Sequence, residues 1–293
     1  MGKRASKNTS KKRVTINRPV RSNASLSVSN DLLLWDPFVL TERTKLTRLQ
    51  DDILDELDED RKLKGFVLAN SKGETKLATV TSMVMGSPTQ LDGAICYALL
   101  YLAKHTKAHK LHFRNFSQLA QAINMPRIKK ERLIKGLYRL QDVRVVYKDF
   151  YSKNLKSRAA GATNILSEFE YSTEAGDKGI NVTVSEAFLD LVITDERFAP
   201  MQLSALSNMT PLESKWYKYL SAFDDKKKHL HRDLYKISKL FGMNVDAYKN
   251  DPGKLIRMHT NAVEQVSIKT NIDWFVTSHK INSFVPRLSV SRR

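Results

Sequence analysis

The residues best suited to catalysis lie in the run KKKHLHRDLYKISK, where His229 and His231 flank a leucine and Tyr235 and Lys239 follow. On a β-strand, histidines two residues apart can hold a divalent metal, and a tyrosine can then attack DNA, as in rolling-circle nicking enzymes. The spacing of apolar residues here predicts a helix instead, on which residues two apart point in different directions. Tyr235 is only four residues beyond His231, whereas such a nucleophile comes from a separate helix. Nicking therefore stays a minor alternative, and we expect both histidines to be exposed.

Other patterns of catalytic or cofactor-binding residues are missing from the sequence. The remaining histidines have no metal-ligand spacing, and there is neither a phosphate-binding G-x-x-x-x-G-K-[ST] loop nor a G-x-S-x-G nucleophile motif. The run DDILDELDED at 51–60 holds seven acids in ten residues, which is typical of a solvated helical face or a DNA mimic rather than a metal site. We expect no enzyme, no metal and no cofactor.

The charge of the chain indicates a polyanionic partner. Its 293 residues include 49 Lys and Arg against 31 Asp and Glu, a net charge of +18. Nucleic acid fits this balance better than a membrane, since no run approaches the ~20 apolar residues of a spanning helix. The single cysteine, Cys96, lies in an apolar stretch and indicates a buried thiol in a reducing, cytoplasmic compartment.

Two helices are predicted to present cations to that partner. In the first, INMPRIKKERLIKGLYRL, the apolar residues form one stripe with Lys130 and Gln141, and the opposite side carries Gly136 and most of the cations. The DNA-binding candidates of this helix are Arg127, Lys129, Arg132, Lys135 and Arg139. Arg and Lys on such a face can pair with guanine or hold phosphates. An ordinary solvated basic face is the alternative.

The second helix begins at Asp251 as N-cap with Pro252 in the first position. We predict a buried stripe of Leu255, Met258, Ala262 and Val266, with DNA-binding candidates on the other side: Lys254, Arg257, Thr260 and Asn261. Asn can bond adenine, although Glu264 shares this face and repels phosphates.

Each of these helices is the third in a repeated pattern of three helices, and β-type runs follow it. Ser87-Pro88-Thr89-Gln90 and Thr210-Pro211-Leu212-Glu213 each fit a capping box that starts the first helix of a copy. Three helices and a hairpin form a winged helix-turn-helix, so we expect an α+β fold with two tandem winged helix-turn-helix domains and a disordered basic N-terminal tail. The expected divisions are 1–24 for the tail, 25–60 for a linker with an acidic helix, 61–197 for the first domain and 198–293 for the second.

Two further segments supplement this scheme. The strands at 66–69 and 77–84 predict a β-hairpin that leads into the first domain. The segment at 152–163, between strands of the first wing, is predicted to be a mobile loop that follows the DNA backbone, with three candidate cations: Lys153, Lys156 and Arg158. A plain solvated loop is the alternative.

The tandem resembles the winged-helix initiators of bacterial plasmid replication, the TrfA-like and replication initiator protein A group. FAPMQLSALSNMTPLESKWYKYLSAF with HLHRDLYKISKLF carries most of the likeness, and GSPTQLDGAICYALLYLAKH adds to it. The family commonly has Arg-Leu-Tyr where this chain has Lys215-Trp216-Tyr217. The resemblance implies a protein that binds direct repeats of double-stranded DNA at an origin, promotes its opening, and recruits the host helicase or its loader, often as a dimer that becomes active as a monomer. Gln202-Leu203-Ser204-Ala205-Leu206 also resembles a sliding-clamp-binding peptide, although the usual Leu-Phe ending is absent.

Two other functions stay open. A winged-helix transcriptional regulator would bind an inverted repeat, whereas an initiator binds direct repeats. An RNA-binding or structural nucleoprotein would show little sequence preference. In each case we expect a cytoplasmic protein associated with bacterial nucleoid or plasmid DNA and not with a membrane.

Overall fold

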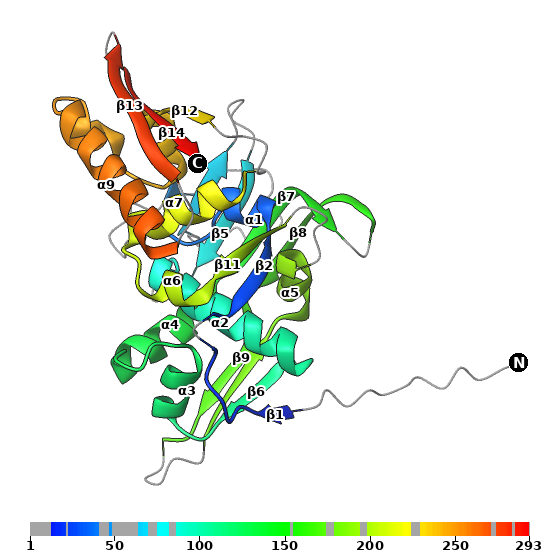
Figure 1. Ribbon diagram of the computed structural model, residues 1–293. Helices are drawn as coiled ribbons and strands as arrows, with labels where there is room; N and C mark the ends of the chain where they lie inside the picture. Colours follow the sequence, from blue (N-terminus) through cyan, green and yellow to red (C-terminus); the bar gives the residue numbers. More distant parts are fainter. Residues whose placement is uncertain are drawn as a thin grey trace, which may run out of the picture.

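The computed structural model describes residues 13–21, 23–40, 47–48, 64–69, 75–81, 86–152, 155–173, 179–193, 198–223, 229–270, 274–282 and 285–292. Within these residues the protein is a mixed α+β structure, which confirms the predicted class. Two units lie at opposite ends, and an N-terminal segment packs between them (Figure 1). No helix in this part of the chain is long and apolar enough to cross a bilayer.

The first unit is organised around helix α2, which is buried along most of its length. Its elements follow in the order helix, strand, helix, helix, strand, strand: α2 (Gln90–Thr106), β6 (Lys110–Phe113), α3 (Phe116–Ala122), α4 (Lys130–Asp142), β9 (Leu166–Tyr171) and β10 (Ile180–Val184). The last strand lies between the other two, so that the sheet order is β1-β6-β10-β9, and β1 (Arg13–Thr15) extends it in parallel to β6. Helix α5 (Glu186–Ile193) ends the unit.

The second unit repeats this order. It consists of α7 (Pro211–Ser221), β12 (His229–Asp233), α8 (Leu234–Leu240), a 3-10 turn η1 (Val245–Tyr248), α9 (Pro252–Thr270), β13 (Trp274–Asn282) and β14 (Val285–Arg292). The strand order β12-β14-β13 matches β6-β10-β9 of the first unit, because the last strand again pairs with the strand that follows the first helix.

A separate five-stranded sheet corrects the predicted position of the first wing. The long strands β7 (Arg144–Ser152) and β8 (Ser157–Asn164) leave the first unit between α4 and β9; β7 pairs with β5 (Thr75–Thr81) of the N-terminal hairpin, and β8 pairs with β7. The sheet order is β3-β4-β5-β7-β8, in which β3 is Thr47–Arg48 and β4 is Lys64–Ala69. The predicted hairpin strands at 66–69 and 77–84 are therefore confirmed as β4 and β5 for the described residues, while 82–84 lie outside them. The segment predicted as a loop at 152–163 is instead mostly strand β8, because its backbone pairs with β7.

The helix caps agree with the sequence in one unit and shift in the other. Thr210 and Glu213 form the predicted capping box of α7, with Pro211 in the first turn. The box of α2 consists of Thr89 and Asp92, two residues later than predicted. Residues before it stay extended because Val39 N donates to Pro88 O at 2.9 Å and Gln90 N donates to Val39 O at 3.0 Å.

The N-terminal segment connects both units, contrary to the predicted tail and linker. After β1, the strand β2 (Ser25–Ser29) pairs antiparallel with β11 (Phe198–Gln202), and α1 (Asn30–Leu34) packs on α7. Ile16, Val20 and Ala24 are buried. Disorder up to residue 24 is therefore wrong for the described residues from 13 onward, since these apolar side chains find a core. Residues 1–12 and the acidic run at 51–60 lie outside the described part.

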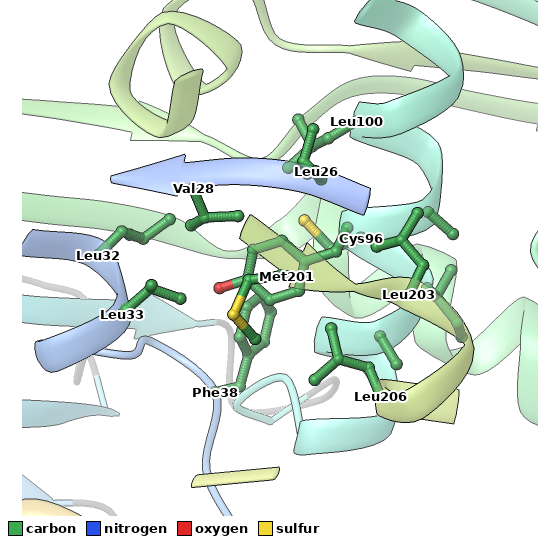
Figure 2. Packing of buried hydrophobic residues seen from close by; sticks show 14 of the residues in the cluster. Leu26, Val28, Leu32, Leu33, Phe38, Cys96, Leu100, Met201, Leu203 and Leu206 are labelled. Atoms are coloured by element: carbon green, nitrogen blue, oxygen red, sulfur yellow. The ribbon is translucent and has the colours of Figure 1, made fainter. Parts of the chain in front are cut away.

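The core between the units is apolar and continuous (Figure 2). Leu26 and Val28 of β2 and Leu32 of α1 face Cys96 of α2 and Met201 of β11, and each is at most 1% exposed. Cys96 is buried as predicted. Helix α6 (Leu203–Ser207) completes this core with Leu203 and Leu206. The units are thus held by shared packing rather than by a linker.

Candidate nucleic-acid interface and the junction behind it

The start of helix α4 presents exposed cations, as predicted. Arg127 and Lys129 precede the helix and Lys135 lies on its second turn, and all three are exposed. Lys130 is exposed as well, with its ammonium 4.9 Å from the centre of the Phe116 ring. The side chains of Leu133, Leu137 and Leu140 are buried on the opposite side and hold the helix on its unit.

Two arginines of α4 point inward, which corrects their predicted role. Arg139 is 2% exposed, and its Nη1 lies 3.1 Å from Oδ2 of the fully buried Asp92. Arg132 is 27% exposed and donates to Thr89 Oγ1 at 2.9 Å, with its Nη2 3.4 Å from Asp92 Oδ1. Both arginines therefore hold α4 against the cap of α2. Arg139 is unavailable to DNA.

Gly136 also faces α2 rather than solvent. A Cβ at this position would lie 2.7 Å from Asp92 Oδ1 and 3.2 Å from Ile95 Cδ1. The glycine therefore permits the close contact that the Asp92 ion pairs need. The helical pattern of α4 did not show this, because the carboxylate that attracts Arg139 belongs to another helix.

Two of the predicted backbone-contacting cations near 152–163, Lys156 and Arg158, lie at the five-stranded sheet and not in the hairpin that pairs with β6. Lys156 is exposed in the turn between β7 and β8, and its φ is 50°. Arg158 is half exposed, and its Nη1 lies 3.3 Å from Asp31 Oδ2 and also donates to the carbonyl of Asp149. Lys153 lies outside the described residues. This group is therefore separate from the cationic start of α4, and one of its members is already paired.

Helix α9 has the predicted start and most of the predicted face. Asp251 caps it by accepting from Lys254 N at 2.8 Å. Lys254, Arg257 and Asn261 are exposed, and Glu264 is exposed one turn later. Thr260 is only partly exposed, and its hydroxyl is buried with no hydrogen-bond partner among the described residues. Its role as a base contact is therefore less direct than that of the other three.

The buried side of α9 differs from the predicted stripe because it includes a histidine. Leu255, Ala262 and Val266 are buried as predicted, whereas Met258 is only partly buried. His259 is fully buried: its Nδ1 accepts from Trp216 Nε1 at 2.9 Å, and its Nε2 lies 2.8 Å from Ser238 Oγ. Burial lowers the pKa of His259 to about 4, so the ring is neutral near pH 7. The imidazole thereby joins α7, α8 and α9 by hydrogen bonds.

His229 and His231 lie on strand β12 and not at the start of a helix. The prediction that helical geometry turns the two side chains in different directions is therefore wrong. Both rings are on the exposed face of the strand and bond the hydroxyls of Ser291 and Ser289 at 2.7 Å each. The described part of the chain contains no group of three or more His, Cys, Asp or Glu that could hold a metal ion. These histidines are exposed, as predicted.

The peptide that resembles a clamp-binding motif is mostly interior. Leu203 and Leu206 are each 4% exposed and belong to the core between the units (Figure 2). The backbone N–H of Gln202 donates to the Tyr217 hydroxyl at 2.7 Å. A clamp could grip these leucines only if α6 left its core. The two leucines therefore have a structural role in this core.

Behind these surfaces, a buried charge cluster joins the N-terminal segment to both units. The Asp36 carboxylate lies 3.0 Å from Lys215 Nζ and 3.1 Å from Lys218 Nζ, both on α7. Gln90 of α2 donates to Asp36 at 2.7 Å and accepts from Lys218 at 2.7 Å and from Ser214 at 2.9 Å. All five side chains are at most 3% exposed. The cluster, defined by these five residues, is the junction cluster.

The junction cluster carries one carboxylate against two ammonium groups. Burial alone would raise the pKa of Asp36, but the charges of Lys215 and Lys218 and the bond from Gln90 outweigh it, so the pKa lies below its ordinary value. Burial lowers the pKa of Lys215 as well, and it lowers the pKa of Lys218 to about 8. The carboxylate is thus ionised, and Lys218 releases its proton near pH 8 because it is buried and shares one anion with a second buried cation.

The fold defined by these two repeated units is shared by proteins of known structure. Crystal structures of domains 2 and 3 of RctB superpose on the chain. One gives a TM-score of 0.52 at 10% identity, covering 90% of this chain and 99% of that one. The other, of residues 155–483 of RctB, gives 0.50 at 10% identity, with coverages of 90% and 96%. At this identity the likeness shows the fold alone. No protein-family model and no curated protein sequence matches the chain.

Proposed function

We propose that the protein is a replication initiator that binds double-stranded DNA through two tandem winged helix-turn-helix domains. Its fold is that of domains 2 and 3 of RctB, which is itself a replication initiator. The resemblance of the sequence to plasmid initiators supports the same role and favours a plasmid origin. The protein would act without catalysis or cofactor, in the bacterial cytoplasm.

The repeated geometry of α4 and α9 carries this proposal. Each is the third helix of its unit, each is anchored by a buried apolar side, and each presents exposed cations near its start: Arg127, Lys129 and Lys135 in α4, Lys254 and Arg257 in α9. The third helix of a winged helix-turn-helix is the one that enters the major groove. The hairpins β9–β10 and β13–β14 would then be the wings.

A rigid pair of DNA-reading units favours a long site. The core and the junction cluster connect the two units, so binding of one unit brings the second close to the duplex and makes its association intramolecular. We expect direct repeats beside a stretch that opens easily. Opening would use binding and bending of the DNA, followed by recruitment of the host helicase or its loader. We also propose that the protein can form a homodimer and contact the host's sliding clamp.

Binding to duplexes tiled across the DNA that flanks the gene tests this function. We would measure fluorescence anisotropy with the full chain and compare Arg127→Ala/Lys129→Ala with the charge-matched control Lys104→Ala/Lys148→Ala, whose lysines are exposed elsewhere. If each side chain contributes about 1–2 kcal/mol at the DNA, the first variant loses roughly 30–1000-fold in affinity for its site. The control should retain most of the affinity.

Three results separate the alternatives. Selective binding to direct repeats supports an initiator. Selective binding to an inverted repeat in its own promoter would indicate a transcriptional regulator, and equal binding to all duplexes would indicate a nucleoprotein that uses charge alone. Unchanged affinity of Arg127→Ala/Lys129→Ala would remove α4 from the groove and overturn the proposed interface.

A further inference from the structure

The N-terminal segment passes beside the helix-turn-helix of the first unit. Ile16 N donates to His112 O on β6 at 2.9 Å, and Val20 N donates to Ala122 O, the last residue of α3, also at 2.9 Å. The side chains of Ile16 and Val20 are 4% and 5% exposed. Figure 1 shows this dark blue stretch passing from β1 toward β2 next to α3. Residues 16–21 are thus held at the end of α3, where the turn to α4 begins.

This anchored stretch presents two arginines to solvent. Arg18 and Arg21 are exposed on either side of the buried Val20, and the side chain of neither forms a hydrogen bond or ion pair with another described residue. Arg127 and Lys129, also exposed, stand on the turn that follows Ala122. The hydrogen bond of Val20 to Ala122 therefore holds the stretch with residues 18 and 21 at the end of α3, from which the chain continues into the turn that carries residues 127 and 129.

We infer that Arg18 and Arg21 are DNA-phosphate contacts that extend the interface of α4. This inference rests on the proposed DNA-binding function and adds a second element to it. Guanidinium groups hold phosphates by charge-assisted bonds, and contacts to phosphates set the register of a protein on the duplex without reading sequence. The two arginines would grip the backbone that borders the groove entered by α4, so that the N-terminal segment both joins the units and clamps the DNA.

The salt dependence of binding tests the inference. Each phosphate contact contributes about 0.9 to the slope of log K against log salt concentration. Arg18→Ala/Arg21→Ala should therefore reduce the slope by about 1.8 and lower the affinity roughly 30-fold at 0.15 M salt. The loss should be the same on the preferred site and on an unrelated duplex. Lys104→Ala/Lys148→Ala, with the same change in charge, should leave the slope within about 0.5 of that of the original chain.

One outcome of these measurements would overturn the proposed function, and another would overturn only the role of Arg18 and Arg21. If the original chain binds no duplex, the proposed function fails. If the original chain binds but Arg18→Ala/Arg21→Ala keeps its slope and affinity, or loses no more than the control, the two arginines do not touch DNA while the function stands. Urea unfolding of the variants verifies folding, which we expect to be unchanged because both side chains are exposed. Ethylation interference on the bound site should show phosphates that become tolerant to ethylation in the double variant.

Discussion

The junction cluster makes a sharp prediction for Asp36→Asn. The substitution keeps the size of the side chain but removes the only carboxylate within the cluster, leaving the ammonium groups of Lys215 and Lys218 buried at 2% and 0% exposure. Breaking a buried ion pair from one side costs about 3–5 kcal/mol, since the remaining charge is left uncompensated. We expect the free energy of unfolding to fall by about this amount, which is a large share of the stability of an ordinary domain.

Lys218→Met provides the matched contrast. It preserves most of the apolar stem and removes the surplus charge, leaving Asp36 paired with Lys215 at 3.0 Å. Gln90 Oε1 still accepts from Ser214 at 2.9 Å. We therefore expect a change within about 1 kcal/mol of the original chain, because buried ion pairs replaced by apolar groups are often close to neutral. Urea denaturation at pH 7, followed by circular dichroism, measures both variants.

The pH dependence has a sign that follows from Lys218. Its pKa is lowered from 10.5 to about 8 in the folded protein. Between about pH 8 and 10.5 the unfolded chain binds a proton that the folded protein has released, so stability rises with pH across this window. At about 1.4 kcal/mol per pH unit the gain approaches ~3 kcal/mol. Below pH 8 both states hold the proton and this group contributes no slope.

The two variants also test this account of the charge. Lys218→Met should lose the part of the alkaline rise that comes from Lys218 and keep only the part that comes from Lys215, whereas a variant of an exposed lysine such as Lys104→Met should keep the whole rise. The reasoning is refuted if Asp36→Asn costs less than about 1 kcal/mol, or if Lys218→Met costs as much as Asp36→Asn. Either result would mean that packing, and not charge compensation, holds the junction.

Two further predictions concern the helices that carry the proposed interface. Gly136→Ala should destabilise the protein by about 1–2 kcal/mol in urea unfolding, although alanine has the better helix propensity. The reason is that the new methyl group would lie 2.7 Å from Asp92 Oδ1, and Arg139 holds that carboxylate in place. An unchanged or higher stability would show that α4 can move away from α2. His259→Leu should lower the free energy of unfolding by about 2–4 kcal/mol, since Trp216 Nε1 and Ser238 Oγ lose their hydrogen-bond partner at buried positions. A loss below about 1 kcal/mol would show that the imidazole is not needed to join α7, α8 and α9.

Local chemistry was sufficient to predict where helices α7 and α9 begin. Thr210 with Glu213, and Asp251 ahead of Pro252, mark the beginnings of α7 and α9 where the structure has them. These signals work because caps and apolar spacing act within one or two turns of a helix. The exposed cations Arg127, Lys129, Lys254 and Arg257 were predictable for the same reason, since they lie close to these starts.

Contacts between residues distant in the sequence could not be predicted from it. β12 was predicted as helix because its five residues pair only with β14, about 60 positions later. The same limit applies to β7, whose pairing with β5 of the N-terminal hairpin places β8, and with it Lys156 and Arg158, away from the expected wing. Which strands pair depends on residues that are distant in the sequence, so the residues of one short segment do not predict it.

The sequence by itself determined an α+β chain with two repeated units, a strong positive charge and cations at the starts of two amphipathic helices. Only the tertiary structure decided that Asp92 turns Arg132 and Arg139 inward, that Asp36 joins both units, and that residues 13–21 and 23–40 contribute side chains to the core. The physical reason is that a charged side chain is buried only where an opposite charge or a hydrogen-bonding group compensates its loss of water. For the arginines and for Asp36, that group comes from another element of the fold.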